Sequence, residues 1–583
     1  MVEAISHQPF YSTGTWIEES LGVYVGWAAQ KNSFSDGQPL INERKDVVLV
    51  FSGEEYPEPE TVARLKRAGH QVEAKGPSYL VHLYEDDPKF PAGLNGRFHG
   101  LLIDRRQAKA VLFNDRYGVH RLSFHQTPDT FYFAAEAKAI LAVRPELRKL
   151  DPQAFGEFVS CSCVLEDRTL FEGIRLVPGG AAWEFRKGPV PQKRSYFDVR
   201  EWEEQAPLSG EEYYQDLREV FSRNLARYFN GRQKVAVSLT GGMDTRVIMA
   251  WQKAEPDSLP CYTYGGAFRD CRDVQVARRV ARVCGQSHRV VTVGDEFLSR
   301  FASYAERSIF LSDGCVHVNR AADLYVSEKA REIAPVRIVG TYASEVLKQA
   351  PMFKPVDPMP GLFQPELRSS LQQAKLTYAR LREQHPVTFA AFRQSPWWHY
   401  GVLSLEQIHL TVRSPFLDND FVRLIYRQPK MLDMVRDVRW RMICDGNPAL
   451  GRIPSDLGVN GGGLSTLAAR RFHEFTFKAE YAYDSGMPQW LARADHFVSP
   501  LHFERLFLGR HKFAHFRVWY RDALSNYVRE VLLDSRSLSR PYVDRKGLEA
   551  VVSGHLRGDR NYTGELHTLL TLELLHRQFI DLQ

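Results

Sequence analysis

Short apolar runs separated by turn residues are the main pattern up to residue 195. Runs of this kind, bounded by Gly, Pro, Asn and Asp, predict strands. Apolar positions at helical spacing are fewer there and predict helices over 60–68 and 136–143. This pattern predicts two packed antiparallel sheets with helices outside. The predicted strands include 21–26, 46–51, 100–103, 131–135 and 180–185.

From residue 210 onward the pattern changes, because helical stretches alternate with short, wholly apolar strands. Such alternation predicts a parallel sheet covered on both faces. The region 464–583 is helical by pattern, and the stripe 569–575 is expected to face a core. The predicted fold class is therefore α/β. The expected divisions are an α+β domain over 1–195, a parallel-sheet domain over 210–463, and a helical C-terminal part over 464–583.

The strand predicted at 235–239 runs directly into Gly241-Gly242, and Asp244 stands where a helix would begin. The backbone N–H groups of such a turn, together with a helix N-terminus, are suited to hold an anion. Thr240 and Thr245 offer hydroxyl groups, and Asp244 is a candidate Mg²⁺ ligand beside a phosphate. A strand–turn–helix with two permissive glycines is the plain alternative.

This turn is neither a Walker loop nor a dinucleotide-binding motif. It resembles the Ser-Gly-Gly-x-Asp-Ser pyrophosphate loop of the N-type ATP pyrophosphatases, which cleave ATP between its α and β phosphates. The resemblance implies an adenine-nucleotide α-hydrolase-like fold and the use of ATP and Mg²⁺. The candidate nucleotide-binding residues are Ser238, Leu239, Thr240, Gly241, Gly242, Asp244, Thr245, Tyr264, Gly265 and Gly340.

Four segments of the first half resemble, in order and spacing, the class II glutamine amidotransferase domain of the asparagine synthetase family. They are Phe51–Pro57, Leu94–Phe98, Asn114–Gly118 and Phe133–Ala139. The resemblance implies an Ntn-type sandwich of antiparallel sheets for 1–195.

The glutaminase chemistry of that family has no counterpart in this sequence. The family's nucleophile is an N-terminal cysteine, whereas Val2 follows Met1 here and the first cysteine is Cys161. Ser52 replaces an asparagine that helps to stabilise the oxyanion in the family. We therefore expect that this domain does not hydrolyse glutamine.

Two later segments resemble the synthetase domain of the same family. Val339–Val346 aligns with Ser-Gly-Glu-Gly-Ser-Asp-Glu-Val, and Val412–Asp418 aligns with Arg-x-Pro-Phe-Leu-Asp. The resemblance suggests Glu345, Arg413 and Tyr342 as catalytic residues, and Asp244 with Glu345 as metal ligands. A core aromatic and a helix-packing ion pair are the plain alternatives for Tyr342 and Arg413.

Three departures concern this second half. Thr341 stands where the synthetases have a glutamate, and Ser344 replaces a magnesium-binding aspartate. The family's charge-stabilising lysine has no counterpart in 450–458, where Arg452 is the only cation. Whether these changes abolish catalysis is left open by the sequence.

Composition narrows the possible classes of protein. The net charge of +6, from 76 Lys and Arg against 70 Asp and Glu, comes without a dense basic run, so we expect no nucleic-acid partner. The seven cysteines match no zinc spacing and are expected to be free thiols in a reducing compartment. No apolar run approaches the ~18 residues of a membrane span, and the start does not resemble a secretory signal. We expect a cytoplasmic enzyme without a membrane partner.

Together these features predict an asparagine synthetase-like, ATP-dependent ligase. A small-molecule or peptide carboxylate would become an acyl-adenylate with release of pyrophosphate, and ammonia or an amine would then displace AMP. One alternative is a tailoring amidation, or a ring closure by an intramolecular amine as in β-lactam synthetases and peptide-cyclising relatives. Another is a non-catalytic partner protein of the same fold. The identity of the carboxylate and amine and the assembly, for which a homodimer is one option, do not follow from the sequence.

Overall fold

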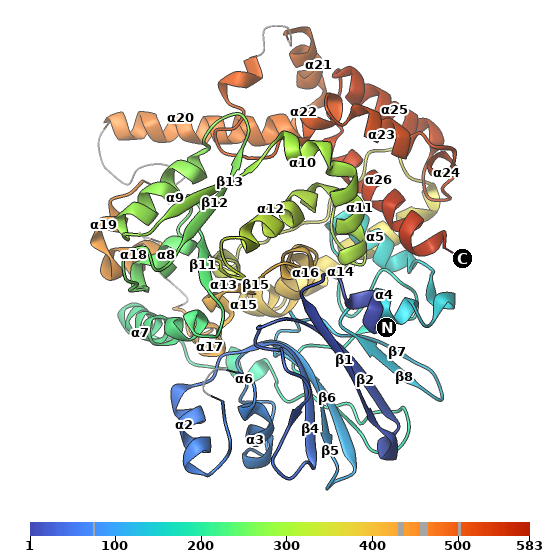
Figure 1. Cartoon of the computed structure of the whole chain (residues 1–583). Coiled ribbons are helices and arrows are strands. Elements are labelled where there is room, and N and C mark those ends of the chain that lie inside the picture. The colour runs from blue at the N-terminus through green and yellow to red at the C-terminus, as the bar shows by residue number, and fades with distance from the viewer. Residues whose placement is uncertain (74–75, 430–436, 455–463, 499–502, 583) are drawn as a thin grey trace.

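The computed structural model describes residues 1–73, 76–429, 437–454, 464–498 and 503–582. Figure 1 shows antiparallel strands in the N-terminal part, a parallel sheet with helices around it in the middle, and helices at the C-terminal end. This arrangement confirms the predicted fold class.

The largest N-terminal sheet has five antiparallel strands in the order β10-β6-β5-β4-β3. Alternate residues of its strand β4 face opposite sides, as the period of two requires. Val47, Leu49 and Phe51 enter a core with two helices, α2 and α3, whereas Val48 and Val50 enter a core with the β1-β2 hairpin. The strands of these sheets are β1 (Tyr11–Glu18), β2 (Val23–Gln30), β3 (Leu40–Ile41), β4 (Val47–Glu55), β5 (Gly96–Asp104), β6 (Lys109–Asn114) and β10 (Ala182–Phe185).

A further three-stranded sheet, in the order β8-β7-β9, and six helices complete the N-terminal part. Helix α2 corresponds to the helix predicted over 60–68, and α4 to the one predicted over 136–143. The pattern did not predict α3 or α5. These elements are β7 (Ser123–Gln126), β8 (Phe131–Ala134), β9 (Arg175–Leu176), α1 (Val2–Ile5), α2 (Pro59–Arg67), α3 (Tyr79–Asp86), α4 (Ala137–Leu141), α5 (Pro152–Cys161) and α6 (Arg200–Glu203).

The second large sheet is wholly parallel, in the order β13-β12-β11-β14-β15. The chain builds outward from central β11 through β12 to β13, then crosses to the other side of β11 to form β14 and β15. The strand order therefore reverses between β11 and β14, which is where ligands bind in open parallel sheets. The strands are β11 (Val235–Ser238), β12 (Cys261–Gly266), β13 (His288–Val293), β14 (Val336–Ile338) and β15 (Thr411–Arg413).

Helices surround this sheet, and the longest of them, α7, leads into β11 (Figure 1). A capping box starts α7, since Ser209 and Glu212 each accept a backbone N–H of the other. The helices are α7 (Gly210–Phe229), α8 (Asp244–Trp251), α9 (Arg272–Val283), α10 (Asp295–Ser299), α11 (Phe301–Leu311), α12 (Ala321–Arg331), α13 (Ala343–Lys348), α14 (Arg368–Arg382), α15 (Pro386–Thr388), α16 (Ser395–Gln407), α17 (Asn419–Ile425), α18 (Val438–Gly446) and α19 (Pro448–Gly451).

Among the C-terminal helices, those from residue 516 onward share one hydrophobic core with the parallel sheet. Helix α26 is buried on all sides, and the predicted stripe 569–575 lies in it. Among the described residues, no helix has both the length and the apolar character needed to cross a bilayer. The helices are α20 (Leu464–Tyr481), α21 (Gln489–Val498), α22 (Phe516–Arg521), α23 (Ser525–Leu532), α24 (Ser535–Leu538), α25 (Arg545–Arg557) and α26 (Thr563–Leu575).

Two residues of the 412–418 segment join the two halves of the chain. Arg413, at the end of β15, donates to both carboxylate oxygens of Glu54 at 2.8 and 2.6 Å. Asp418 accepts a hydrogen bond of 2.9 Å from the Asn95 side chain. Arg413, Glu54 and Asp418 are all buried, so these contacts form a dry polar junction between β4, β5 and the parallel sheet.

We expect Glu54→Gln to lower the stability of the whole chain. Removing one partner of a buried ion pair leaves the other charge uncompensated, which costs roughly 3–5 kcal/mol. The measurement is the denaturant midpoint, followed by fluorescence and by circular dichroism.

Glu211 offers a matched control, because it forms an exposed bidentate pair with Arg441 at 2.8 and 2.8 Å. Solvent screens such a pair, so Glu211→Gln should leave the midpoint nearly unchanged. Equal shifts for the two variants would contradict a stabilising role for the junction.

Candidate functional site

The turn between β11 and α8 is held in shape by its own side chains. The Thr240 hydroxyl accepts the Gly242 N–H at 3.3 Å, and Thr245 Oγ1 accepts the Thr240 N–H at 3.4 Å. The buried Arg246 guanidinium donates to the Gly241 carbonyl at 3.2 Å. These three contacts hold the backbone of the turn in a defined conformation.

A carboxylate already accepts from one backbone donor of this turn. Asp273 Oδ1 accepts the Gly241 N–H at 2.8 Å. Helix α9 begins at Arg272 with Cys271 as its N-cap, so Asp273 lies in the first turn of the helix and is not its cap. An anionic oxygen on this N–H has the chemistry that a phosphate oxygen would have there.

The glycine at 340 allows β14 to approach the start of α8. A Cβ at Gly340 would lie 2.6 Å from Asp244 Cβ and 2.9 Å from the Thr245 nitrogen. No other residue type fits at that distance without moving the backbone. The loop after β14 therefore packs directly on the phosphate-loop candidate at the point where the strand order reverses.

Asp244 lies in a half-buried polar cluster with residues far away in sequence. Its carboxylate accepts a 3.1 Å hydrogen bond from Ser344 Oγ and pairs with the Arg439 guanidinium. Arg439 also donates to Ser344 at 3.0 Å and pairs with Asp437 at 2.7 Å. Burial raises the pKa of Asp244, the nearby Glu345 raises it further, and Arg439 opposes both effects.

The cation beside Asp244 is not the one that the sequence suggested. Arg452 was the only cation in 450–458, but it is exposed, and the structure gives it no contact with Asp244. Residues 455–458 lie outside the described residues. Arg439 stands at the start of α18, and the sequence carried no motif that would have connected it with Asp244.

Glu345, the second candidate metal ligand, is also paired. Its carboxylate accepts from His399 Nε2 of α16 at 2.8 Å. The Tyr342 ring meets the His399 ring edge-on, with centroids 4.9 Å apart. Tyr342 is buried at a positive φ of 77°, an uncommon conformation for a bulky residue. Burial raises its pKa, and the Arg97 guanidinium of β5 opposes the shift.

The other predicted nucleotide contacts lie on the sheet itself. Ser238 and Leu239 are buried, and the Leu239 N–H donates to the Tyr262 carbonyl at 2.8 Å. Tyr264 and Gly265 fall inside β12 rather than after it, because the strand extends to residue 266. The loop that follows β12 therefore starts at residue 267.

Arg413, predicted as a catalytic helper, has its described partners at the junction. Besides Glu54, it donates to the carbonyls of Tyr228 and Asn230 at 2.9 and 2.7 Å. The turn at 240–245 follows β11, whereas Arg413 ends β15, which is two strands away in the same sheet.

A cavity of about 200 Å³ lies between the N-terminal sheets and α16. Ser52 and Glu54 of the amidotransferase-like segment line it, together with His99 and His120. The Ser52 hydroxyl lies 2.9 Å from His120 Nε2, and burial lowers the pKa of both histidines. No cysteine is among the described residues that line this cavity.

Two family models match the chain, one on each half. Residues 1–197 match the glutamine amidotransferase domain, and residues 216–440 match asparagine synthase.

Two similar relatives are asparagine synthetases of Bacillus subtilis (strain 168), both described as glutamine-hydrolysing. Asparagine synthetase 1 is 22% identical over 355 residues, covering 59% of this chain and 54% of the relative. Asparagine synthetase 3 is 23% identical over 349 residues, covering 56% of this chain and 55% of the relative. The chain thus spans about half the length of the curated relatives it matches.

Solved structures show weaker similarity. A glutamine phosphoribosylpyrophosphate amidotransferase from B. subtilis has a TM-score of 0.22 at 13% identity, covering 46% of this chain and 51% of that chain. This score is too low to add to the assignment. From the two family models and the related sequences, the chain belongs to the asparagine synthetase family.

Proposed function

We propose that this protein is an ATP-dependent, amide-forming ligase that activates a carboxylate as an acyl-adenylate and releases pyrophosphate. The observation that carries the proposal is the turn at 240–245, which stands at the strand reversal with Gly340 packed against Asp244. Parallel sheets bind nucleotides at this position. An amine or ammonia then displaces AMP from the activated carboxylate.

The residues around the turn fit ATP with Mg²⁺. Asp244, Glu345 and Ser344 offer the oxygen ligands that Mg²⁺ prefers. When bound, Mg²⁺ neutralises the charge of the phosphates. The bidentate pairing with Asp437 holds the Arg439 guanidinium in place. Its remaining nitrogen, which pairs with Asp244 here, can donate to a phosphate oxygen instead.

The amide-forming step is assigned to the group around His399. His399 and Glu345 are hydrogen-bonded, and such a pair can take the proton from an attacking amine. Tyr342 packs against His399 and keeps the imidazole in position. Arg413 acts as a positioning residue, because it joins β15 to Glu54 beside this group.

The amidotransferase-like half is proposed to be inactive toward glutamine. A glutaminase of this family needs a thiolate, and the cavity at Ser52 has no cysteine in its described lining. Burial raises the pKa of Cys161 to about 12 and that of Cys163 well above its ordinary value, so neither is a reactive thiolate at neutral pH.

Asp244→Ala and Asp244→Asn should each lower ATP–pyrophosphate exchange by roughly a thousandfold, since the charge stabilisation that depends on this carboxylate amounts to several kcal/mol. Asp522→Asn is the control, because Asp522 is an exposed carboxylate with an arginine partner in the C-terminal helices. Near-normal exchange in both Asp244 variants would refute the assignment of the site. Absence of exchange in the unmodified chain with every carboxylate tried would favour the non-catalytic alternative.

Glutamine should not serve as the nitrogen donor. We expect no glutamate release from glutamine above a blank without enzyme, and no increase in AMP formation when glutamine is added. Ammonium or an amine should support AMP formation instead. Glutamate release that co-purifies with the chain and persists in the Asp244→Ala variant would contradict the proposal.

Aspartate with ammonia is expected to be a poor substrate pair. Thr341, Tyr342 and Ser344 differ from the synthetase pattern, and they all lie just after the end of β14, in the turn and in the first residues of α13. Loops at strand ends set specificity, whereas the phosphate-binding turn is shared. Aspartate should therefore give less AMP than a larger carboxylate, including one that carries its own amine. Efficient asparagine release at metabolite concentrations would overturn this expectation.

A further inference from the structure

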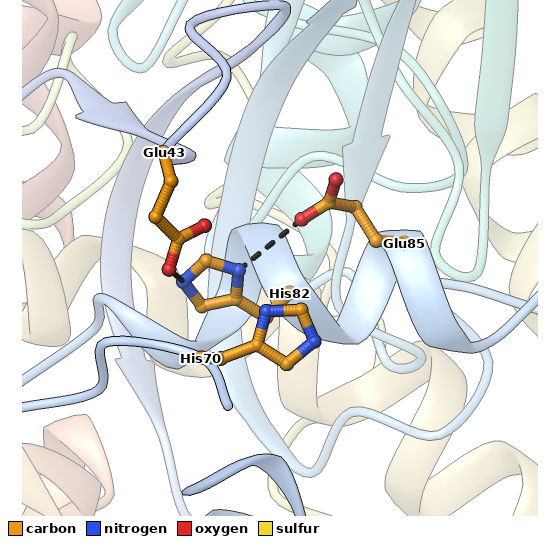
Figure 2. A group of neighbouring side chains, drawn as sticks. All are labelled: Glu43, His70, His82 and Glu85. Atoms are coloured by element: carbon orange, nitrogen blue, oxygen red, sulfur yellow. Dashed lines mark hydrogen bonds and ion pairs between the residues drawn. The ribbon is translucent and has the colours of Figure 1, made fainter. Parts of the chain in front are cut away.

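A cluster of histidines and carboxylates lies on the outer helical layer of the N-terminal half. It comprises Glu43 after β3, His70 after α2, and His82 and Glu85 on α3 (Figure 2). One ligand atom from each of these four residues lies within 4.8 Å of the others. Neither the proposed ligase chemistry nor the junction of the two halves uses these side chains.

His82 is the centre of the cluster and is only 2% exposed. A carboxylate faces each of its ring nitrogens. Nδ1 lies 3.2 Å from Glu85 Oε2, which is a hydrogen-bond distance, whereas Nε2 lies 3.6 Å from Glu43 Oε1, which is too long for one. A neutral imidazole has a single N–H, so when Nδ1 donates to Glu85, the Nε2 lone pair faces the Glu43 carboxylate.

A nitrogen lone pair and a carboxylate that face each other repel, and a cation between His82 Nε2 and Glu43 Oε1 would remove that repulsion. Two ligands that are each about 2.1 Å from a tetrahedral Zn²⁺ lie about 3.4 Å apart. The observed 3.6 Å between His82 Nε2 and Glu43 Oε1 is close to this separation. The two atoms are therefore spaced as a pair of metal ligands rather than as a hydrogen bond.

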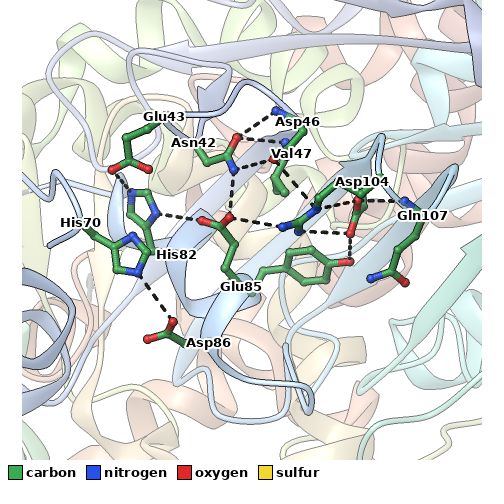
Figure 3. A network of polar contacts seen from close by, with 12 residues as sticks. Asn42, Glu43, Asp46, Val47, His70, His82, Glu85, Asp86, Asp104 and Gln107 are labelled. Atoms are coloured by element: carbon green, nitrogen blue, oxygen red, sulfur yellow. Dashed lines mark hydrogen bonds and ion pairs between the residues drawn. The ribbon is translucent and has the colours of Figure 1, made fainter. Parts of the chain in front are cut away.

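His70 supplies the third candidate ligand atom, a ring nitrogen. Its Nε2 pairs with Asp86 at 3.6 Å, and its other ring nitrogen lies on the side of His82 (Figures 2 and 3). The two rings are stacked, with centroids 4.3 Å apart and planes 27° apart. Their lone pairs converge on one ion after the His70 ring turns, which its half-buried position in a loop allows.

The outer nitrogens of both histidines are held by carboxylates that have their own positive partners. Glu85 receives a 2.9 Å hydrogen bond from Asn42 and lies 3.5 Å from Arg106. Asp86 pairs with Arg64 at 3.1 Å. Figure 3 shows how this network surrounds Glu85. Histidine ligands of metals usually donate their second N–H to a carboxylate, as His82 Nδ1 can to Glu85, whereas Asp86 lies at a longer ion-pair distance from His70 that leaves this ring free to turn.

Glu43 differs from these two carboxylates. The only ion pair found for it among the described residues is with His82. The inner side of the cluster thus has two imidazole nitrogens and one carboxylate without a compensating arginine or lysine.

We propose that Glu43, His70 and His82 bind a divalent transition-metal ion of the zinc class, with water in the fourth position and with Glu85 and Asp86 as outer partners. Nitrogen together with carboxylate oxygen favours Zn²⁺ over Mg²⁺ and Ca²⁺, which prefer oxygen ligands alone. The ion would tie the segment after β3 and the segment after α2 to α3. Glu73, three residues beyond His70, pairs with Arg232, which lies just before β11. By holding the segment after α2, the ion would therefore also stabilise a contact with the start of the parallel sheet.

The test uses the full chain, stripped with a chelator and titrated with ZnCl₂. We expect one tightly bound ion per chain by elemental analysis after gel filtration, and a higher melting temperature with Zn²⁺ than without. Mg²⁺ should not compete. The visible spectrum of the Co²⁺-loaded chain should indicate four-coordination.

Glu43→Gln and His70→Ala should each weaken binding by more than about tenfold, and Glu85→Gln by about 10–100-fold, the usual range for outer partners. His82 is too buried for a safe substitution, whereas Glu43 and His70 are partly exposed. His496→Ala is the matched control, since His496 is an exposed histidine of α21. Absence of zinc binding, or equal binding by the unmodified chain and the Glu43 and His70 variants, would overturn the proposal.

Discussion

The buried ion pair between Glu54 and Arg413 is the contact on which the relation of the two halves depends. Charges without water need complete pairing, and here both carboxylate oxygens of Glu54 are bonded by one guanidinium. Arginine suits this position because its planar fork matches a carboxylate, which a lysine cannot do. The segment that most resembles a synthetase is therefore bonded to the segment that most resembles a glutaminase. The amidotransferase-like half thus supplies a structural part of this junction, whether or not it has a catalytic role of its own.

The junction also lies close to the candidate site residues that follow β14. Arg413 ends β15, the strand beside β14. The turn after β14 carries Gly340 and Tyr342, and the helix α13 that follows carries Glu345. Tyr342 is in contact with His399 on one side, and Arg97 of the N-terminal half acts on it electrostatically. A shift of the N-terminal sheets would thus alter the environment of Tyr342 as well as the Glu54 contact. The N-terminal sheets thus contact the parallel-sheet half both at Glu54 and near Tyr342.

The sequence predicted the elements whose patterns depend on local physics. Strand β11 was found because a strand buried within a parallel sheet reads as a short apolar run, and the turn after it was found because two consecutive glycines are a strong turn signal. Helix α3 was missed because its buried residues, from Tyr79 to His82, are consecutive and lack a helical period. Helix α5 was missed although Asp151 caps it and Pro152 occupies its first position, a signal that could have been used.

The parts of the site that the sequence did not predict all depend on contacts between distant residues. Arg439 meets Asp244 across a separation of 195 residues. Asp273 reaches Gly241 across 32. A half-buried carboxylate such as Asp244, with Glu345 nearby, is stabilised by a positive charge, because burial and a second carboxylate both disfavour its ionised form. Arg439 supplies that charge in the chain alone. This need for a positive charge explains why Arg439 stands beside Asp244 although the family's lysine has no counterpart in 450–458. The charge can come from any position along the chain that the fold brings close to Asp244.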